Sequence, residues 1–228
     1  DLVVVVANDS VIENVNIYNM TKNAGLVIFE SYRTTIISPT ISIAIPEVDL
    51  AGAFDIKSCH DCQVFGYNIY GLGSAPPHIT SGIRVHREHD LMNPSTSENN
   101  TIIGGNMNNL QYGIIIEDTN DTNIVGGTIR NADGAIVFPN WGQKTAINTF
   151  ISNMIWKNVT TPIVYGVTPT LLITRDNYGG SPYNFGNNAS APTAFGAGDT
   201  YFDTDLSYMC VYNGTAYAPM NAKTAPCT

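Results

Sequence analysis

Apolar residues recur along the chain in pairs whose members are five positions apart. Six such pairs are evident, and a seventh, Ile173 with Tyr178, is weaker. The six pairs are Ile12 with Ile17, Ile36 with Ile41, Val64 with Ile69, Ile102 with Met107, Ile124 with Ile129, and Phe150 with Ile155. Two positions after each first member stands a small or turn-forming residue: Asn14, Ser38, Gly66, Gly104, Gly126 and Ser152. A short unit repeated in this way predicts a solenoid, in which each copy packs on the next.

A second β-rich stretch follows each pair, and glycine usually opens it. These stretches begin at Gly25, Gly52, Gly82, Gly113, Gly134 and Pro162. The shortest repeat is 22 residues, from Ile102 to Ile124, and no helical periodicity appears. Leucine-rich repeats share this period, but their Leu and Asn framework is missing. We therefore predict an all-β fold, a parallel β-helix of about seven coils over residues 1–178, with Ile stacked inside and ladders of Asn and Thr at the corners.

The chain changes character after residue 178. Residues 179–198 are rich in Gly, Asn, Ala, Pro and Ser, which predicts a linker. Within residues 199–228, alternation over Tyr208–Tyr212 predicts a strand, and Asn213-Gly214 is a strong hairpin-turn pattern. We expect a small β-hairpin module at this end.

Composition limits the function. The 228 residues include 10 Lys and Arg against 19 Asp and Glu, for a net charge of −9, and 13% of residues are charged while 43% are hydrophobic. The acidic balance argues against nucleic acid and against an anionic membrane surface as partners. No apolar run approaches the ~20 residues that span a bilayer. Leu2–Ala7 lacks the basic flank of a signal peptide. We expect Asp1 to open within a coil, continuing from a missing part, with a partner, a preceding domain or a neighbouring subunit covering that end.

Two of the four cysteines form the motif Cys59-His-Asp-Cys62. A zinc site would need a second pair at ligand spacing, which Cys210 and Cys227 do not provide. A redox CxxC normally opens a helix in a βαβ unit, and no such unit is visible. The remaining interpretation is a disulfide between Cys210 and Cys227 that closes the C-terminal module, with Cys59 and Cys62 either paired or free. The histidines form no metal-binding pair, so we expect no metal; Ca²⁺ at the turn Glu117–Asp121 is the alternative to a plain polar turn.

Asn-x-Ser/Thr sequons are slightly more frequent than the composition predicts. They lie at Asn8, Asn19, Asn99, Asn120, Asn158, Asn188 and Asn213. Each is a candidate glycosylation site if the chain is exported from a host that glycosylates.

Alternation along the second stretches places a dense group of charges on one outward face. The group comprises Asp55, Lys57, Arg84, His86 and Glu117. A polysaccharide lyase needs a base, here His86 or Lys57, and a cation such as Arg84 to neutralise a uronate carboxylate. A glycosidase needs two carboxylates, which Asp55 and Glu117 would supply. We favour a simpler interpretation, a ladder of alternating charge with a structural or binding role.

Apolar outward positions flank these charges. They are Val27, Phe29, Ile115, Ile136 and Phe138. Apolar columns of this size are normally covered, and the cover could come from residues 179–198, a loop or another subunit. We favour packing in a homotrimer. The aromatic residues Trp141, in a protruding loop, and Tyr112, together with Tyr67 and Tyr70, are candidate glycan contacts, although Trp141 equally fits a coil cap.

The coils Asn100–Met107 (Asn-Thr-Ile-Ile-Gly-Gly-Asn-Met) and Asp121–Ile129 (Asp-Thr-Asn-Ile-Val-Gly-Gly-Thr-Ile) resemble right-handed β-helices of the pectin-lyase-like superfamily. The resemblance covers roughly residues 1–180 and includes polysaccharide lyases, glycosidases and phage or viral tailspikes, so it indicates fold more than function. Gly198–Leu206 (Gly-Asp-Thr-Tyr-Phe-Asp-Thr-Asp-Leu), followed by Tyr212-Asn-Gly-Thr, resembles a short module near the ends of phage and viral fibre proteins, with Tyr217 where a Trp is usual.

These resemblances imply a protein of a virion or extracellular appendage that packs as a homotrimer or with other appendage proteins. The expected function is structural or receptor-binding, with a cell-surface polysaccharide as ligand and no cofactor. The alternative is a polysaccharide lyase or glycoside hydrolase on the same fold, and a secreted adhesin with no viral link is a third hypothesis.

Overall fold

The computed structural model consists of β-strands and contains no helix within the residues described. The described residues are 3–20, 24–44, 52–71, 81–87, 97–139, 146–166, 169, 172–175, 177, 185–186, 200–203, 208–212 and 217–219. Within them, no helix is long and apolar enough to cross a membrane. The chain divides into two compact units, Asp1–Asn177 and Tyr178–Thr228.

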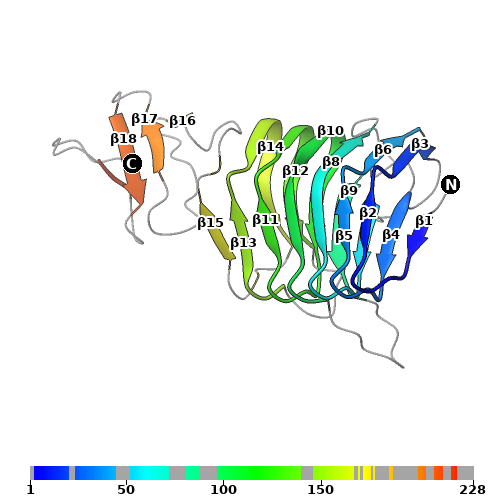
Figure 1. Ribbon diagram of the computed structural model, residues 1–228. Coiled ribbons are helices and arrows are strands. Elements are labelled where there is room, and N and C mark those ends of the chain that lie inside the picture. Colours follow the sequence, from blue (N-terminus) through cyan, green and yellow to red (C-terminus); the bar gives the residue numbers. More distant parts are fainter. Residues whose placement is uncertain are drawn as a thin grey trace. The chain divides into compact units, whose positions relative to one another are not determined.

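The first unit is a solenoid of parallel strands (Figure 1). Its short strands are β1 (Val3–Val5), β2 (Val11–Glu13), β3 (Asn16–Met20), β4 (Leu26–Phe29), β5 (Thr35–Ile37), β6 (Thr40–Ile43), β7 (Gly52–Lys57), β9 (Ser81–His86), β11 (Asn123–Val125), β13 (Thr149–Ser152) and β15 (Leu172–Arg175). Its long strands, several of which bend around a corner, are β8 (Gln63–Tyr70), β10 (Thr101–Ile116), β12 (Thr128–Phe138) and β14 (Ile155–Tyr165). Strand pairing throughout the described part of this unit is parallel.

A column of single backbone bridges at one corner follows the chain through about five turns. The bridged residues are Asn8, Tyr32, His60, Glu98, Asn120 and Ile147. Each step rises by one strand spacing, about 4.8 Å. The predicted all-β parallel solenoid is therefore confirmed, while the number of about seven coils stays a prediction.

Stacked apolar side chains fill the interior of the coils. One fully buried column consists of Ile36, Val64, Ile102, Ile124 and Ile151. A second buried column consists of Ile41, Ile69, Met107, Ile129 and Trp156. The five-residue spacing in the sequence therefore marks two inward positions on either side of a corner.

The sixth apolar pair is Ile151 with Trp156, so the prediction of Phe150 with Ile155 was one residue off. Trp156 is in register with Ile129 and is 6% exposed, whereas Ile155 is 38% exposed. Adjacent apolar residues at both positions fit the spacing equally well, and only pairing with the neighbouring coil distinguishes them.

Ile136 and Phe138 point into the core and are almost fully buried, so the prediction that they face outward was wrong. That prediction aligned Gly134 with Gly113. In the structure Gly134 is in register with Tyr112, because register partners in this coil are 22 residues apart.

Residues with positive φ form the corners. At the corner between the two inward columns, φ lies between 54° and 70° at Asn14, Ser38, Gly66, Gly104, Gly126 and Asn153. Five of these six were predicted as turn formers, and Asn153 takes the place predicted for Ser152 because of the same one-residue shift. Asn tolerates this left-handed conformation better than most residues with a side chain.

Amide side chains at successive corners hydrogen-bond from coil to coil. Asn158 Nδ2 donates to Asn131 Oδ1 at 2.7 Å, and Asn131 Nδ2 donates to Asn108 Oδ1 at 2.8 Å. At another corner, Asn99 Nδ2 donates to Asp61 Oδ1 at 2.9 Å. The predicted ladders of Asn side chains are confirmed at these corners.

Tyr67 is fully buried beside the paired glycines of the next coils. A Cβ atom on Gly105, where φ is +99°, would lie 2.4 Å from the Tyr67 carbonyl oxygen. A Cβ atom on Gly127 would lie 2.8 Å from the Tyr67 hydroxyl. The Gly-Gly sequences of these coils therefore make room for one large aromatic side chain.

The second unit contains a four-stranded sheet of β16 (Phe185–Gly186), β17 (Thr200–Asp203), β18 (Tyr208–Tyr212) and β19 (Tyr217–Pro219). The β17–β18 and β18–β19 pairs are antiparallel. Cys210 lies in β18, whereas Cys227 and the predicted turn Asn213-Gly214 lie outside the described residues. The disulfide between Cys210 and Cys227 stays a prediction.

Candidate functional site

Charged side chains from three neighbouring strands meet on the outward face of the solenoid. Asp55 and Lys57 of β7 are in register with Arg84 and His86 of β9. Glu117 directly follows β10, the next strand in the sheet. The structure thus brings together the five residues predicted from alternation, and we call them the charged cluster.

Two pairs of side chains within the charged cluster lie close together. Arg84 Nη2 lies 2.7 Å from Glu117 Oε2, and the two side chains are 18% and 3% exposed. His86 Nε2 lies 3.8 Å from Asp55 Oδ2, and these side chains are almost fully buried. Lys57 Nζ lies 5.3 Å from the centroid of the Phe29 ring, a cation–π distance. Pairing and burial together favour a structural ladder over an open catalytic arrangement.

Backbone groups orient two members of the charged cluster. The Gly52 N–H donates to Asp55 Oδ1 at 3.2 Å. His86 Nδ1 lies 2.9 Å from the carbonyl oxygen of Arg87. Because a carbonyl oxygen only accepts hydrogen bonds, His86 Nδ1 must be the protonated nitrogen of this contact, and Nε2 is the nitrogen that faces Asp55.

A further ion pair extends the ladder and was missed from the sequence. Arg87 Nε lies 3.3 Å from Asp118 Oδ2, and the Asp118 side chain is fully buried. Both residues follow the ends of their strands, and Asp118 has a φ of +47°. The period-two alternation of side chains does not apply beyond a strand end. The available indication of this ion pair was that positive and negative residues continue to alternate between neighbouring coils.

The apolar column beside the charged cluster is covered in part. Ile115 faces outward in register with Arg84 and is 0% exposed, and its neighbour Val137 is also buried. Val27 and Phe29 are half-buried. The prediction that this column is covered is confirmed for Ile115, which is buried within the single chain.

Cys59 and Cys62 occupy one level of a buried polar ladder at a corner. The corresponding residues of neighbouring coils are Ser31 with Thr34, Ser97 with Asn100, and Thr119 with Thr122. Both thiols are buried and free, which is one of the two alternatives left open by the sequence. Cys59 Sγ donates to the carbonyl oxygen of Ile28 at 3.3 Å, and Cys62 Sγ to that of Ser31 at 3.4 Å. The CxxC motif therefore takes positions that hydroxyl and amide residues take elsewhere.

The two thiols also influence each other's ionisation. The neighbouring Cys62 side chain raises the pKa of Cys59, and burial adds to this rise. The Cys59 side chain in turn lowers the pKa of Cys62, while burial acts in the opposite direction. Cys59 is therefore the member that keeps its proton.

The predicted aromatic contacts differ in exposure. Tyr67 is fully buried, so its prediction as a glycan platform was wrong: the glycine pairs enclose it. Tyr70 is 45% exposed and Tyr112 is half-buried. Trp141 lies outside the described residues.

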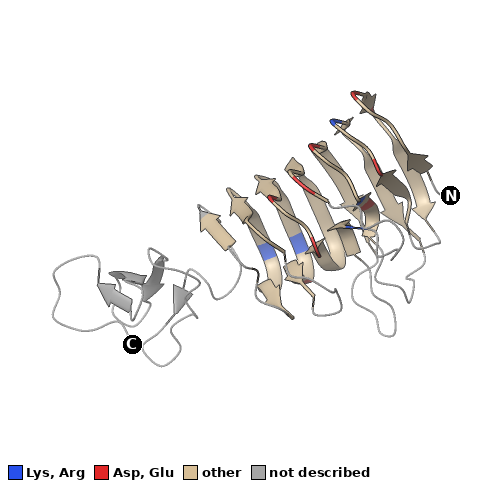
Figure 2. Ribbon diagram, turned by 90° about the horizontal axis from the view of Figure 1, so that it is seen from below, with Lys and Arg blue, Asp and Glu red and all other residues tan. Residues whose placement is uncertain are grey.

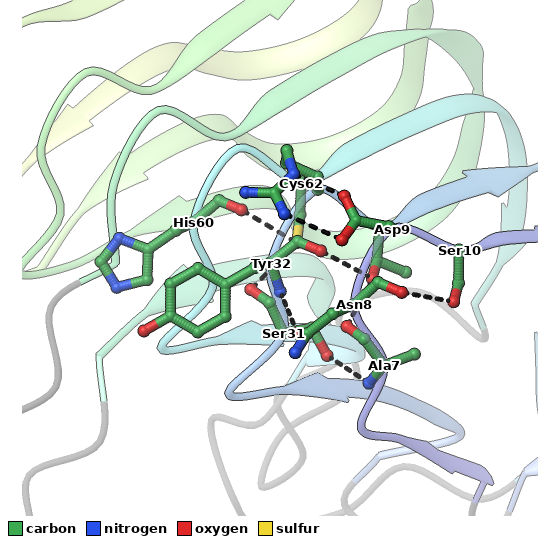
Figure 3. Close-up of polar contacts among 10 residues, drawn as sticks. Ala7, Asn8, Asp9, Ser10, Ser31, Tyr32, His60 and Cys62 are labelled. Atoms are coloured by element: carbon green, nitrogen blue, oxygen red, sulfur yellow. Dashed lines mark hydrogen bonds and ion pairs between the residues drawn. The ribbon is translucent and has the colours of Figure 1, made fainter.

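An exposed aromatic pair was missed. The rings of Tyr32 and His60 stack with centroids 4.9 Å apart and an interplanar angle of 5°, and Figure 3 shows them side by side at the corner. Tyr32 is 45% exposed, and His60 Nδ1 lies 3.9 Å from Glu98 Oε2 in the next coil. The two residues hold the same corner position in successive coils, a relationship that could have been read from the repeat.

Several sequon asparagines belong to corner ladders. The side-chain amides of Asn99, Asn120 and Asn158 each donate a hydrogen bond to the preceding coil. Asn8 Oδ1 accepts from the Tyr32 N–H at 3.1 Å. Asn188 and Asn213 lie outside the described residues. Asn19, Asn99 and Asn158 adopt the left-handed conformation of corner residues, and glycosylation at each site stays a prediction.

No group of three or more His, Cys, Asp or Glu side chains is placed to hold a metal ion in the described part of the chain. Within the turn proposed for Ca²⁺, Glu117 and Asp118 face Arg84 and Arg87. The calcium alternative stays a prediction of the sequence.

No protein-family model and no curated protein matches the chain. Among solved structures, the crystal structure of bacteriophage CBA120 tailspike protein 3 is similar, with 12% sequence identity and a TM-score of 0.23. The match covers 94% of this chain and 51% of the tailspike, so the chain spans about half the length of that protein. The parallel pairing of its strands assigns the first unit to the class of parallel β-solenoids.

Proposed function

We propose that the chain is a structural and receptor-binding β-helix of a virion or extracellular appendage, and that it contacts a cell-surface glycan. The observation that supports this most is the closed state of the charged cluster. Arg84 and Glu117 form a largely buried ion pair, and His86 and Asp55 lie close together and are almost fully buried. A catalytic acid, base and cation must be reachable by a polymer, whereas these side chains are mostly buried.

The proposal includes finer features. The solenoid is a right-handed β-helix of about seven coils of the pectin-lyase-like type, and the hairpin module after it is closed by Cys210 and Cys227. The resemblances of Asn100–Met107 and Gly198–Leu206 support these features. Assembly is proposed as a homotrimer or with other appendage proteins, located at the virion surface or outside the cell.

A polysaccharide lyase or glycoside hydrolase on the same fold is the second candidate. One observation favours it: His86 Nε2 is buried and has no hydrogen-bond partner among the described residues, and it faces a carboxylate. An imidazole nitrogen without a hydrogen-bond partner could accept a proton from a substrate, which is the role of a general base. The burial of His86, at 5% exposure, is the counter-observation.

The test is binding of the full chain to a panel of neutral and acidic cell-surface polysaccharides, with the oligomeric state measured by light scattering on the same sample. The proposal expects saturable binding to at least one polysaccharide and a homo-oligomer. If the chain binds no member of a broad panel, the proposed glycan contact is contradicted. A monomer would contradict the proposed trimer.

A further inference from the structure

Two cations stand side by side on an exposed face of the solenoid. Arg130 of β12 and Lys157 of β14 are register partners on neighbouring parallel strands, and both are exposed. In Figure 2, two basic segments likewise lie on adjacent strands. Neighbouring strands are about 4.8 Å apart, and like charges at opposed positions destabilise a sheet. The chain has a net charge of −9, and two adjacent cations do not stabilise its fold.

Neither cation has an acidic partner within the described residues. The other arginines whose side chains are described, Arg33, Arg84 and Arg87, pair with Asp9, Glu117 and Asp118. The outward positions in register around Arg130 and Lys157 are Ser42, Tyr70 and Asn108 in one column, and Thr40, Asn68, Asn106, Thr128 and Ile155 beside it. None of these positions is acidic, so the face keeps a local positive charge on an acidic molecule.

The same column offers groups that suit a sugar chain. Tyr70, Asn108, Arg130 and Lys157 occupy four consecutive strands, β8, β10, β12 and β14. Tyr70 is 45% exposed, and an aromatic face can pack against a sugar ring. Asn108 Oδ1 accepts a hydrogen bond from Asn131, and its Nδ2 is a hydrogen-bond donor. Cations at the end of the column can pair with carboxylate or sulfate groups.

We infer that this column of Tyr70, Asn108, Arg130 and Lys157, the basic column, binds an acidic polysaccharide that carries carboxylate or sulfate groups. The inference rests on the proposed glycan contact and names the class of glycan and the surface. The basic column and the charged cluster have β10 alone in common, where Asn108 and Glu117, directly after the strand, are nine residues apart. A nucleic acid suits this surface less, because two cations cannot offset the repulsion of a long phosphate chain by an acidic protein.

The test measures binding of the full chain to polygalacturonate, hyaluronan and chondroitin sulfate, and to polygalacturonate whose carboxyl groups have been reduced. The variant Arg130→Gln/Lys157→Gln is compared with wild type. Arg33→Gln and Arg130→Gln form a matched pair of single variants, since each removes one exposed guanidinium. Single-stranded DNA serves as a competing polyanion, and thermal unfolding checks that each variant folds.

We expect wild type to bind at least one acidic polymer and to bind the reduced polymer at least about tenfold more weakly, with affinity falling as salt rises. Arg130→Gln should weaken binding at least about tenfold and Arg33→Gln should not, while the double variant unfolds at the same temperature as wild type or higher. Binding of neutral polysaccharides only, or of acidic ones without loss in the double variant, would overturn the inference and leave the proposed glycan contact intact. Equal competition by DNA would overturn the assignment to a polysaccharide, and no binding of any glycan would remove both.

Discussion

Arg84 Nη2 lies 2.7 Å from Glu117 Oε2 of the next coil, and the Glu117 side chain is only 3% exposed. This contact joins β9 to the end of β10 and places a carboxylate where water scarcely reaches it. A buried charge of this kind is tolerated only while its partner is present.

Removal of one partner should therefore destabilise the solenoid. Arg84→Met is expected to lower the free energy of unfolding by about 3 kcal/mol, because it takes the guanidinium away from a buried carboxylate. The double variant Arg84→Met/Glu117→Gln should recover most of this loss. Denaturant unfolding followed by circular dichroism measures both. Arg33→Met, at the exposed pair with Asp9, is the control and should change little. Equal effects of Arg84→Met and Arg33→Met would contradict the structural ladder.

The turn beside Tyr67 allows a comparison of two adjacent glycines. Gly105→Ala would place a Cβ atom 2.4 Å from the Tyr67 carbonyl oxygen at a φ of +99°, and it should cost at least about 2 kcal/mol. Gly104→Asn, at a φ of +64° with no atom within 4 Å of the added Cβ, should stay within about 1 kcal/mol of wild type. The midpoints of denaturant unfolding measure both variants. Equally small losses of stability in Gly105→Ala and Gly104→Asn would show that the turn is looser than described.

The Tyr67 hydroxyl is buried and has no hydrogen-bond partner among the described residues. Tyr67→Phe removes this unsatisfied group, so we expect unchanged stability or a gain of up to about 2 kcal/mol. Burial also raises the pKa of Tyr67 above its ordinary value of 10. The unfolded chain then loses this proton first, so the contribution of Tyr67 is complete below about pH 10 and declines as the pH rises further. Unfolding measured across alkaline pH should show a shallower decline for Tyr67→Phe, and identical slopes would contradict the assigned burial.

The polar ladder at Cys59 and Cys62 makes a prediction about substitution. Cys59→Ser/Cys62→Thr copies the pair Ser31 and Thr34 of the preceding coil, and it should change the free energy of unfolding by less than about 1.5 kcal/mol. In a background without Cys210 and Cys227, neither buried thiol should react with a thiol reagent until the chain unfolds. Rapid labelling of the native chain would show that the corner is open.

The repeat made the coil architecture predictable because each coil must place its apolar residues inside and its turn residues at the corners. The spacing from Ile102 to Ile124 proved to be the true register. Where a loop lengthens the coil, the spacing no longer fixes the register, and Phe150 was chosen in place of Ile151. Only hydrogen bonding to the preceding coil separates two adjacent apolar residues.

The candidate site was predictable in its membership but not in its contacts. Strand alternation was enough to gather Asp55, Arg84 and Glu117 on one face. Asp55 is also the register neighbour of Arg84, yet Arg84 pairs with Glu117, because a long side chain can reach either coil. Such a choice depends on rotamers and on backbone donors such as the Gly52 N–H, which no periodicity encodes.

The proposed function requires that the charged cluster cleave no glycan. The most direct measurement is the chain-length distribution of a polysaccharide that the protein binds, taken by size-exclusion chromatography before and after prolonged incubation. Wild type, His86→Gln and Glu117→Gln are run in parallel, each shown to be folded. We predict an unchanged distribution with all three proteins. A polysaccharide that wild type shortens and folded His86→Gln leaves intact would contradict the account.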